Sequence, residues 1–391
     1  MKSTMNFIKN IFPKNLSLSE LGLVLLIPLV SFTSHTWLPV PPTMLLFLGA
    51  VVCWIFLQMK GESRIANSVL KNIVIIFSAF SFYLFASQYL MGANFRHYMG
   101  AVFAPLYLVL ILIFSERTSE DFLKNLGRKF IFYSLIILSF EAVGRYAFNV
   151  YQMFQTTGQI YTFYQFKFGG PMYHASNATA THLVALLFFI FWWGNTYKQS
   201  MKKEIGVALV LIVLALSRAA IPAVAIGLFY YFFLKNLDWK KSILALFLIG
   251  IFGVFALLNL RYLIPDYSFQ SKFVLVEEAW AYYQTADIVS ILFGVGFHES
   301  SNILSHFAHN HFLIFLMESG VLGLLFLCAT FFVLIKITNG AAMIVLVPFL
   351  VQTMADSNTF TPYFYVIMAL MLILTKPKIP NDTKKDTLLL D

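Results

Sequence analysis

Long apolar runs recur along this chain, and short polar segments that carry most of its lysines and arginines separate them. A helix needs about 20 mostly apolar residues to cross a bilayer, so each run predicts one transmembrane helix. The pattern predicts an all-α polytopic bundle of about twelve spans. These lie near Leu18–Ser34, Met44–Met59, Ile73–Leu90, Tyr98–Phe114, Ile131–Val150, Ala178–Trp193, Ile205–Leu216, Ala219–Leu234, Ile243–Leu258, Asn310–Ile335, Ala341–Gln352 and Tyr363–Leu374.

One polar stretch, Asn259–Ala308, interrupts this pattern and predicts a large loop outside the membrane. In its middle, Lys272 opens the segment KFVLVEEAWAYY, whose apolar residues recur at near-helical spacing. This spacing predicts a helix on the membrane surface that begins at Lys272, where free backbone amides favour an anion. The sequence FGVGF follows, and its two glycines predict a sharp turn.

Composition and charge agree with a membrane protein. Hydrophobic residues make up 59% of the chain and charged residues 12%. If the N-terminus is cytoplasmic, most of the 27 Lys and Arg residues fall in cytoplasmic segments, as the positive-inside rule requires. Both termini are then cytoplasmic and the large loop faces outward. This bias accounts for the net charge of +9 without a nucleic-acid partner.

The domain plan follows from the same pattern. Residues 1–375 are expected to form a single transmembrane domain that includes the large loop, 259–308, and the polar segment 376–391 a disordered cytoplasmic tail. The two cysteines, Cys53 and Cys328, both fall inside predicted spans, so neither a disulfide nor a metal cluster is supported. Phosphate-binding and dinucleotide-binding glycine patterns do not occur, and no cofactor is implied.

Basic residues on the outer side oppose the positive-inside bias, and binding a substrate phosphate is one reason to keep them there. Anchoring at lipid phosphates or capping of helix carbonyls is the alternative. Arg218 lies in a short turn between two apolar runs, where a planar guanidinium suits a diphosphate. Arg145 follows Glu141 by four residues, which favours a structural ion pair. The outer basic residues are Arg96, Arg145, Lys167, Arg218, Arg261 and Lys272.

Histidines cluster where the large loop re-enters the membrane. His309 is the candidate general base, because a neutral imidazole at the water boundary can take a proton from a sugar hydroxyl. Asn310 could orient that ring or an acceptor sugar, and Glu318 lies further along the same helix. His298, His306 and His311 are weaker candidates, and their spacing does not favour a metal site.

Three motifs in this order resemble the O-antigen polymerase and ligase superfamily of bacterial envelope glycosyltransferases: LSRAA between two spans, FGVGF after a basic residue in an outer loop, and HNHFLIFLMESGVLGLL opening the next span. The resemblance implies a GT-C-like bundle in the bacterial inner membrane. It also implies an inverting transfer of a glycan from undecaprenyl diphosphate to a sugar hydroxyl on the periplasmic face, without a metal. A separate chain-length regulator protein is an implied partner.

The same resemblance implies roles for particular residues. Arg218 would hold the donor diphosphate and His309 would act as base. The family's second loop arginine falls near Lys272, a point charge that lacks the guanidinium fork, and Arg261 could take its place. Arg96 completes the candidate diphosphate-binding set. The candidate acceptor group is Asn310, His311, His298 and Glu318.

We therefore expect an O-antigen polymerase that moves the growing chain from its lipid carrier to the newest lipid-linked repeat unit. A ligase that moves the finished chain to the lipid A core differs only in its acceptor. A flippase or transporter is the alternative of another class, because Glu141, Arg145 and Glu318 could line a path through the membrane.

Overall fold

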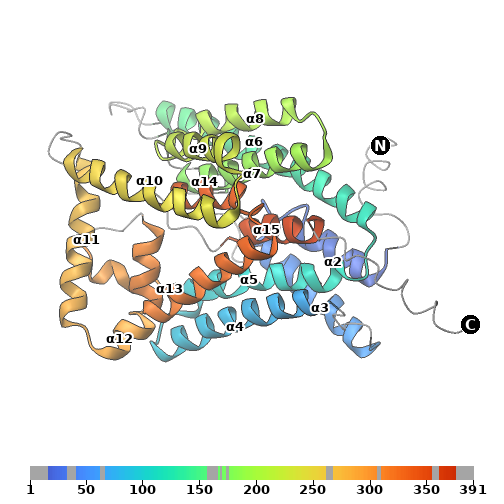
Figure 1. The fold of residues 1–391 in the computed structure, drawn as a ribbon, viewed down its shortest axis with the longest axis horizontal. Coiled ribbons are helices and arrows are strands. Elements are labelled where there is room, and N and C mark those ends of the chain that lie inside the picture. Colours follow the sequence, from blue (N-terminus) through green and yellow to red (C-terminus); the bar gives the residue numbers. More distant parts are fainter. Residues whose placement is uncertain are drawn as a thin grey trace, which may run out of the picture.

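The computed structural model describes residues 16–32, 41–61, 67–155, 166–167, 170–172, 176–260, 267–305, 310–354 and 361–375, with 95–97, 155, 252–260 and 267–269 described by their backbone alone. All regular elements in these ranges are helices (Figure 1). They are α2 (Leu18–Leu26), α3 (Pro42–Met59), α4 (Ser68–Leu90), α5 (Phe95–Ser115), α6 (Glu120–Gln155), α7 (Ser176–Tyr197), α8 (Lys202–Leu214), α9 (Ala220–Phe229), η2 (Tyr230–Leu234), α10 (Trp239–Leu260), α11 (Tyr267–Thr285), α12 (Ile288–Phe293), η3 (Glu299–Asn302), α13 (His311–Ile337), α14 (Met343–Thr353) and α15 (Pro362–Leu374).

A helix coincides with every span that the apolar runs predict. Six of them, α3 to α7 and α13, are long and apolar enough to cross a bilayer, and α9 with η2, α14 and α15 are shorter apolar helices. The chain is therefore a multi-pass helical membrane protein. The full number of spans stays a prediction.

Helix α2 is shorter than the predicted first span, Leu18–Ser34. It begins with a capping box between Ser17 and Glu20 and ends at Leu26. Two residues later comes Pro28, which has no N–H to donate and whose ring would crowd the carbonyl of Val24. The apolar run continues past this point, but the helix cannot.

The helices form two groups with one helix between them. Helices α2 to α5 pack on one another, and α6 to α9 pack together with α14. Between the groups lies α15, in contact with α5, α6 and α7 (Figure 1). Every residue of α15 from Tyr363 to Ile373 is buried. An apolar helix without a polar face needs such a position, because protein then surrounds it on all sides.

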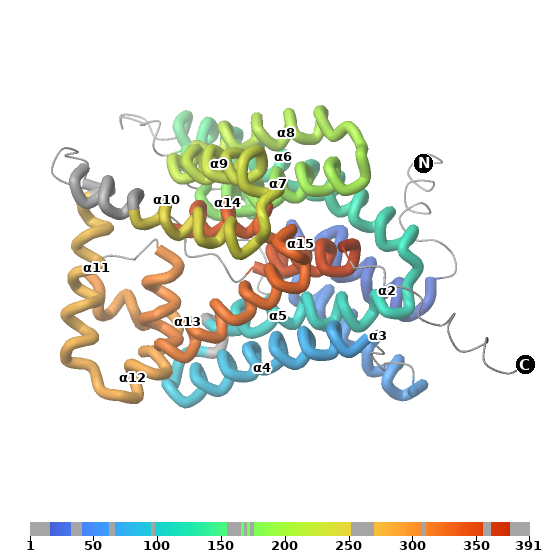
Figure 2. The backbone as a smooth tube through the Cα atoms, in the orientation of Figure 1, coloured from blue at the N-terminus to red at the C-terminus, as the bar shows by residue number. Residues whose placement is uncertain are grey.

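Helices α11 and α12, with the first part of α13, lie at one end of the bundle, on the left in Figures 1 and 2. Helix α11, the first part of α13 and Leu304, which follows η3, share a small core of their own, made of Leu275, Ala279, Leu304, Ile314 and Met317. The described part of the predicted large loop is thus a packed helical structure.

The predicted start of the surface helix is wrong. Helix α11 begins at Tyr267, five residues before Lys272, so Lys272 lies in its second turn. The amides of the first turn, which favour anions, therefore precede Lys272 and are not beside it. The helical spacing after Lys272 is correct, but the spacing does not show where the helix begins.

Helix α13 is broken at Gly320, which has φ 69° and ψ −178°. The last four carbonyl groups before a helix break lose their usual partners. Each of these four accepts a hydrogen bond from elsewhere: Leu316 O from Tyr283 Oη at 2.8 Å, Met317 O from the Val295 N–H at 2.9 Å, Glu318 O from the Gly296 N–H at 3.2 Å and Gln88 Nε2 at 3.0 Å, and Ser319 O from Tyr83 Oη at 2.7 Å.

The FGVGF segment makes the turn that the sequence predicts, with φ of 83° at Gly294 and 100° at Gly296. Its backbone lies directly against the break in α13. A Cβ at Gly294 would overlap the backbone of Glu318, and one at Gly320 would overlap the carbonyl of Leu292. Two glycines are required here because two backbones touch.

Candidate functional site at the turn between α8 and α9

The turn that carries Arg218 is short and fixed from several sides. Helix α8 ends at Leu214, Leu216 takes a left-handed φ of 53°, and α9 begins at Ala220. Tyr146 of α6 donates its hydroxyl to Leu214 O at 2.9 Å. The Ser217 hydroxyl donates to Asn177 Oδ1 of α7 at 2.9 Å and accepts from Gln352 Nε2 of α14 at 3.3 Å. The backbone beside Arg218 is therefore held by three other helices.

A cavity of about 540 Å³ lies at this turn, and its lining is almost wholly apolar apart from two cations. Val213 and Ile221, one from each helix, are both 72% exposed. These exposed apolar side chains place the mouth of the cavity on the apolar surface of the bundle. Its lining residues are Lys167, Ile212, Val213, Leu216, Ser217, Arg218 and Ile221.

Lys167 is the second cation of this cavity, and it comes from the segment between α6 and α7. Its side chain is half-buried, whereas that of Arg218 is exposed. Burial first, and the positive charge of Arg218 second, lower the pKa of Lys167. Two cations on one apolar cavity repel each other, and a bound anion would relieve that repulsion.

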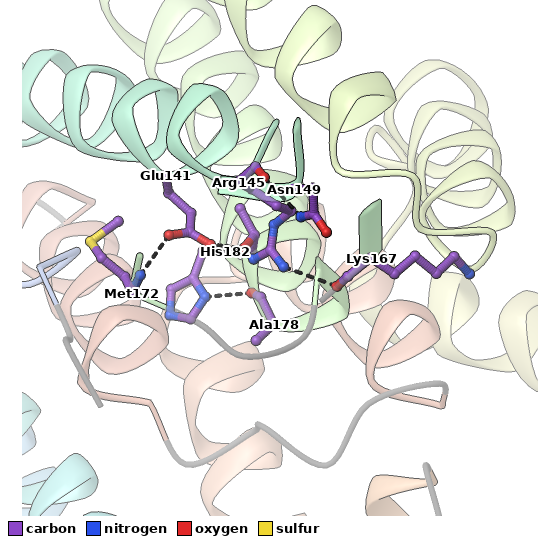
Figure 3. A network of polar contacts seen from close by, with 8 residues as sticks. Glu141, Arg145, Asn149, Lys167, Met172, Ala178 and His182 are labelled. Carbon is purple, nitrogen blue, oxygen red and sulfur yellow. Dashed lines mark hydrogen bonds and ion pairs between the residues drawn. The ribbon is translucent and has the colours of Figure 1, made fainter. Parts of the chain in front are cut away.

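Behind Lys167 lies a buried ion pair, Glu141 with Arg145, which are 0% and 1% exposed. The two are neighbours on one face of α6, as their spacing of four residues predicts. Arg145 Nη1 also donates to Lys167 O at 2.9 Å, and Glu141 Oε2 accepts from the Met172 N–H at 2.7 Å (Figure 3). The pair therefore reaches the segment between α6 and α7 at two points.

The same view shows two more polar groups that lie near the pair. Asn149 Nδ2 donates to Arg145 O at 2.8 Å, and His182 of α7 lies within 2.7 Å of Ala178 O through Nδ1 (Figure 3). The His182 ring also packs against Tyr363 with centroids 4.7 Å apart. Because a carbonyl oxygen can only accept, this contact requires a proton on Nδ1 of His182. This places His182 in the packing of the bundle.

The candidate acceptor residues on α13 have structural contacts. Asn310 is the N-cap of the helix and accepts from the Leu313 N–H at 3.3 Å. His311 is buried and stacks on Phe315 with centroids 5.6 Å apart. Glu318 is also buried and accepts from the Ser300 hydroxyl at 2.6 Å. His298 is exposed and has a left-handed φ of 69°.

Of the remaining candidates, the described residues place only the side chain of Lys272. His309 and Arg261 lie outside the described ranges, as does His306, and Arg96 is described by its backbone alone. Lys272 is exposed on α11 and is absent from the lining of the cavity beside Arg218. The structure thus joins Arg218 with Lys167.

Sequence reasoning counts Lys167 among the outer cations but does not assign it to the diphosphate. Its segment has no periodic pattern from which a position could be predicted. The role of Gln352, which supports the turn, is easier to predict from the sequence. An amide inside an apolar run needs a hydrogen-bond partner, so Gln352 is expected to contact a polar group of another helix.

Within the described ranges no group of three His, Cys, Asp or Glu side chains is placed to hold a metal ion. No protein-family model matches the chain, and no curated protein matches its sequence.

Proposed function

We propose that this protein is a membrane glycosyltransferase of the O-antigen polymerase type, which transfers a glycan from a polyprenyl diphosphate to a sugar hydroxyl of a lipid-linked repeat unit. One observation carries the proposal: an apolar cavity at the surface of the bundle has Arg218 and Lys167 in its lining. An isoprenoid tail suits the apolar walls, and a diphosphate suits the two cations.

The proposed reaction needs little from the protein beyond charge and position. The acceptor hydroxyl oxygen bonds to the anomeric carbon, while the bond from that carbon to the phosphate oxygen breaks and leaves its electron pair on the diphosphate. Arg218 stabilises the charge that builds on that oxygen. The hydroxyl proton goes to a general base, for which His309 is the proposed residue. Attack from the opposite face inverts the anomeric centre.

A second cavity supports a saccharide substrate. It measures about 570 Å³ and lies between α11 and η3. Its lining combines the ring of Tyr282 with the carboxylate of Glu278 and the amide of Asn302. Aromatic faces pack on sugar rings, and carboxylates and amides bind sugar hydroxyls. The glycan of either lipid-linked substrate would suit this groove.

The transporter alternative needs Glu141, Arg145 and Glu318 to line a path, and all three are buried. Glu141 and Arg145 pair with each other and bind backbone groups, and Glu318 accepts from Ser300. These contacts are those of structural charges.

Transfer by the purified protein in liposomes tests the proposal, with undecaprenyl-diphosphate-linked repeat units as the only substrate. The wild type should lengthen glycans without ATP or an ion gradient. Arg218→Ala should lower the rate about 100-fold, as loss of one charge-stabilising donor does elsewhere, and Arg218→Lys should lose less. Arg117→Ala, an exposed arginine between α5 and α6, is the matched control and should keep the wild-type rate.

Three results would contradict the proposal in different ways. If Arg218→Ala transferred glycan at the wild-type rate, the donor diphosphate would not bind at this cavity. Movement of intact lipid without a new glycosidic bond would indicate a transporter. No transfer between repeat units, followed by transfer once a lipid A core acceptor is added to the liposomes, would indicate the ligase.

A further inference from the structure

The segment between α6 and α7 has little regular structure, yet its described part is held firmly. Residues 166–167 form a short helical turn, and 170–172 form a bend against the bundle. Backbone groups at the edge of a membrane protein need partners when no ladder supplies them. Arg145 Nη1 supplies one for Lys167 O at 2.9 Å, and Glu141 Oε2 supplies one for the Met172 N–H at 2.7 Å.

The two side chains that hold this segment are themselves fixed. Arg145 Nη2 donates to Glu141 Oε1 and to Thr179 Oγ1, the latter at 3.2 Å. Thr179 Oγ1 in turn donates to Glu141 Oε1 at 3.3 Å. Because the pair is almost fully buried, each charge depends on the other, and the spare hydrogen-bonding capacity of each goes to the segment.

The segment also fits closely on the pair. A Cβ at Gly170 would overlap the Glu141 carboxylate and the Arg145 guanidinium. An alanine at 170 would therefore force the segment and the ion pair apart. The pair therefore contacts the described part of the segment at Lys167, Gly170 and Met172, so a change in the pair should move these residues.

The side chain of Lys167 leaves this buried network and reaches the cavity. In Figure 3 its carbonyl points to Arg145, while its aliphatic stem extends away from the pair. Beyond the stem lies the cavity that Lys167 and Arg218 both line. The ion pair thus holds the backbone of Lys167, and the side chain of Lys167 places a second positive charge at the cavity.

We propose that Lys167 is the second cation of the diphosphate site and that Glu141 and Arg145 are positioning residues that hold it beside Arg218. This inference rests on the proposed function for the identity of the anion. It assigns a use to a buried charge pair in a transmembrane helix, a feature that usually has a functional reason.

Binding of undecaprenyl diphosphate, with undecaprenol as the uncharged reference, tests the inference on the purified full chain in detergent. Lys167→Met keeps the apolar stem and removes the charge. It should weaken diphosphate binding about ten-fold, the loss expected for one charge-assisted hydrogen bond, and leave undecaprenol binding unchanged. Lys167→Arg should bind the diphosphate nearly as the wild type does.

The double variant Glu141→Leu with Arg145→Met removes both charges and so leaves no isolated one. It should weaken diphosphate binding as Lys167→Met does, and adding Lys167→Met to it should cost nothing further, because both changes act on the same charge. Gly170→Ala displaces the segment without altering any charge and should give the same loss, even if the double variant fails to fold. The control is Glu120→Gln with Lys124→Met, a pair of the same spacing at the exposed start of α6.

If Lys167→Met bound the diphosphate as tightly as the wild type, Lys167 would not be the second cation of the diphosphate site. If Lys167→Met weakened diphosphate binding further when combined with Gly170→Ala or with the double variant, the positioning role would be overturned. Wild-type protein that binds undecaprenol as tightly as the diphosphate would overturn the anion site. Diphosphate binding that follows the expected pattern, in a protein that transfers no glycan in liposomes, would support this inference while refuting the proposed reaction.

Discussion

Two irregular stretches of backbone meet the bundle in different ways. Residues 166–167 and 170–172 are held by buried charged side chains, whereas FGVGF is held by the backbone of α13 and by the neutral side chain of Gln88. Both arrangements satisfy polar groups that would be costly to leave unpaired near lipid. The first does so with an ion pair that also places a cation in a cavity. The second does so with glycines that allow close approach.

The difference predicts how each region fails. A region held by a buried pair is sensitive to the loss of one charge, because the other is left without compensation. A region held by touching backbones is sensitive to added volume, because no side chain can move aside. Loss of one charge should therefore destabilise the region around the ion pair, and an added methyl group should destabilise the region around FGVGF.

The largest effect is expected for Glu141→Ala. It leaves Arg145 buried and unpaired and should lower the free energy of unfolding by about 3–5 kcal/mol. Thermal unfolding in detergent, followed by tryptophan fluorescence, measures the loss. Glu120→Ala removes an exposed partner at the same spacing and should leave the unfolding midpoint nearly unchanged. Equal midpoints for both variants would show that burial of the pair has no energetic weight.

Gly320→Ala tests the other region and should have the next largest effect. The backbone at Gly320 lies in a conformation that only glycine adopts readily, which costs another residue about 1–3 kcal/mol. The added methyl group would also meet the Leu292 carbonyl. The same unfolding measurement applies. Gly206→Ala is the control, because that glycine is inside α8 with open space around it, and there alanine should stabilise the helix.

Much of the fold follows from the sequence, because apolar runs and helices coincide along the whole described chain. The exceptions have local causes. The early end of α2 could have been predicted from Pro28. The break at Gly320 is harder to predict, since a glycine inside an apolar helix often causes no break. The break is stabilised because FGVGF, a segment some 25 residues earlier, supplies partners for two of the four freed carbonyls, and tyrosine side chains of α4 and α11 supply partners for the other two.

The candidate site follows from the sequence only in part. The turn at Arg218 is predictable, since two apolar runs meet at a lone arginine. Lys167 is not, because its place depends on contacts to Arg145 from a different segment. Asn310 and Glu318 attract interest as polar residues beside or within an apolar run. The bond that Asn310 accepts from the Leu313 N–H is a local helix cap, whereas the bond that Glu318 accepts from Ser300 depends on tertiary structure. The role of His309 stays a prediction, because that residue lies outside the described ranges.

The smallest expected effect is a pH dependence of diphosphate binding. It should depend on the region that contains Lys167 and not on the region around FGVGF. Burial and the charge of Arg218 lower the pKa of Lys167 in the free protein. A bound diphosphate would raise that pKa again, so binding takes up a proton wherever the pH lies between the two values. Affinity for undecaprenyl diphosphate should therefore fall as the pH rises through the lowered pKa of Lys167, by no more than Lys167→Met loses.

Lys167→Arg should remove this pH dependence, because a guanidinium stays charged throughout the range. Tyr83→Phe, which alters only the neutral region, should retain it. Binding curves collected at several pH values and constant ionic strength make the comparison. If the affinity of Lys167→Arg still changed with pH, the proton would belong to another group. The pH dependence would then not distinguish the two regions.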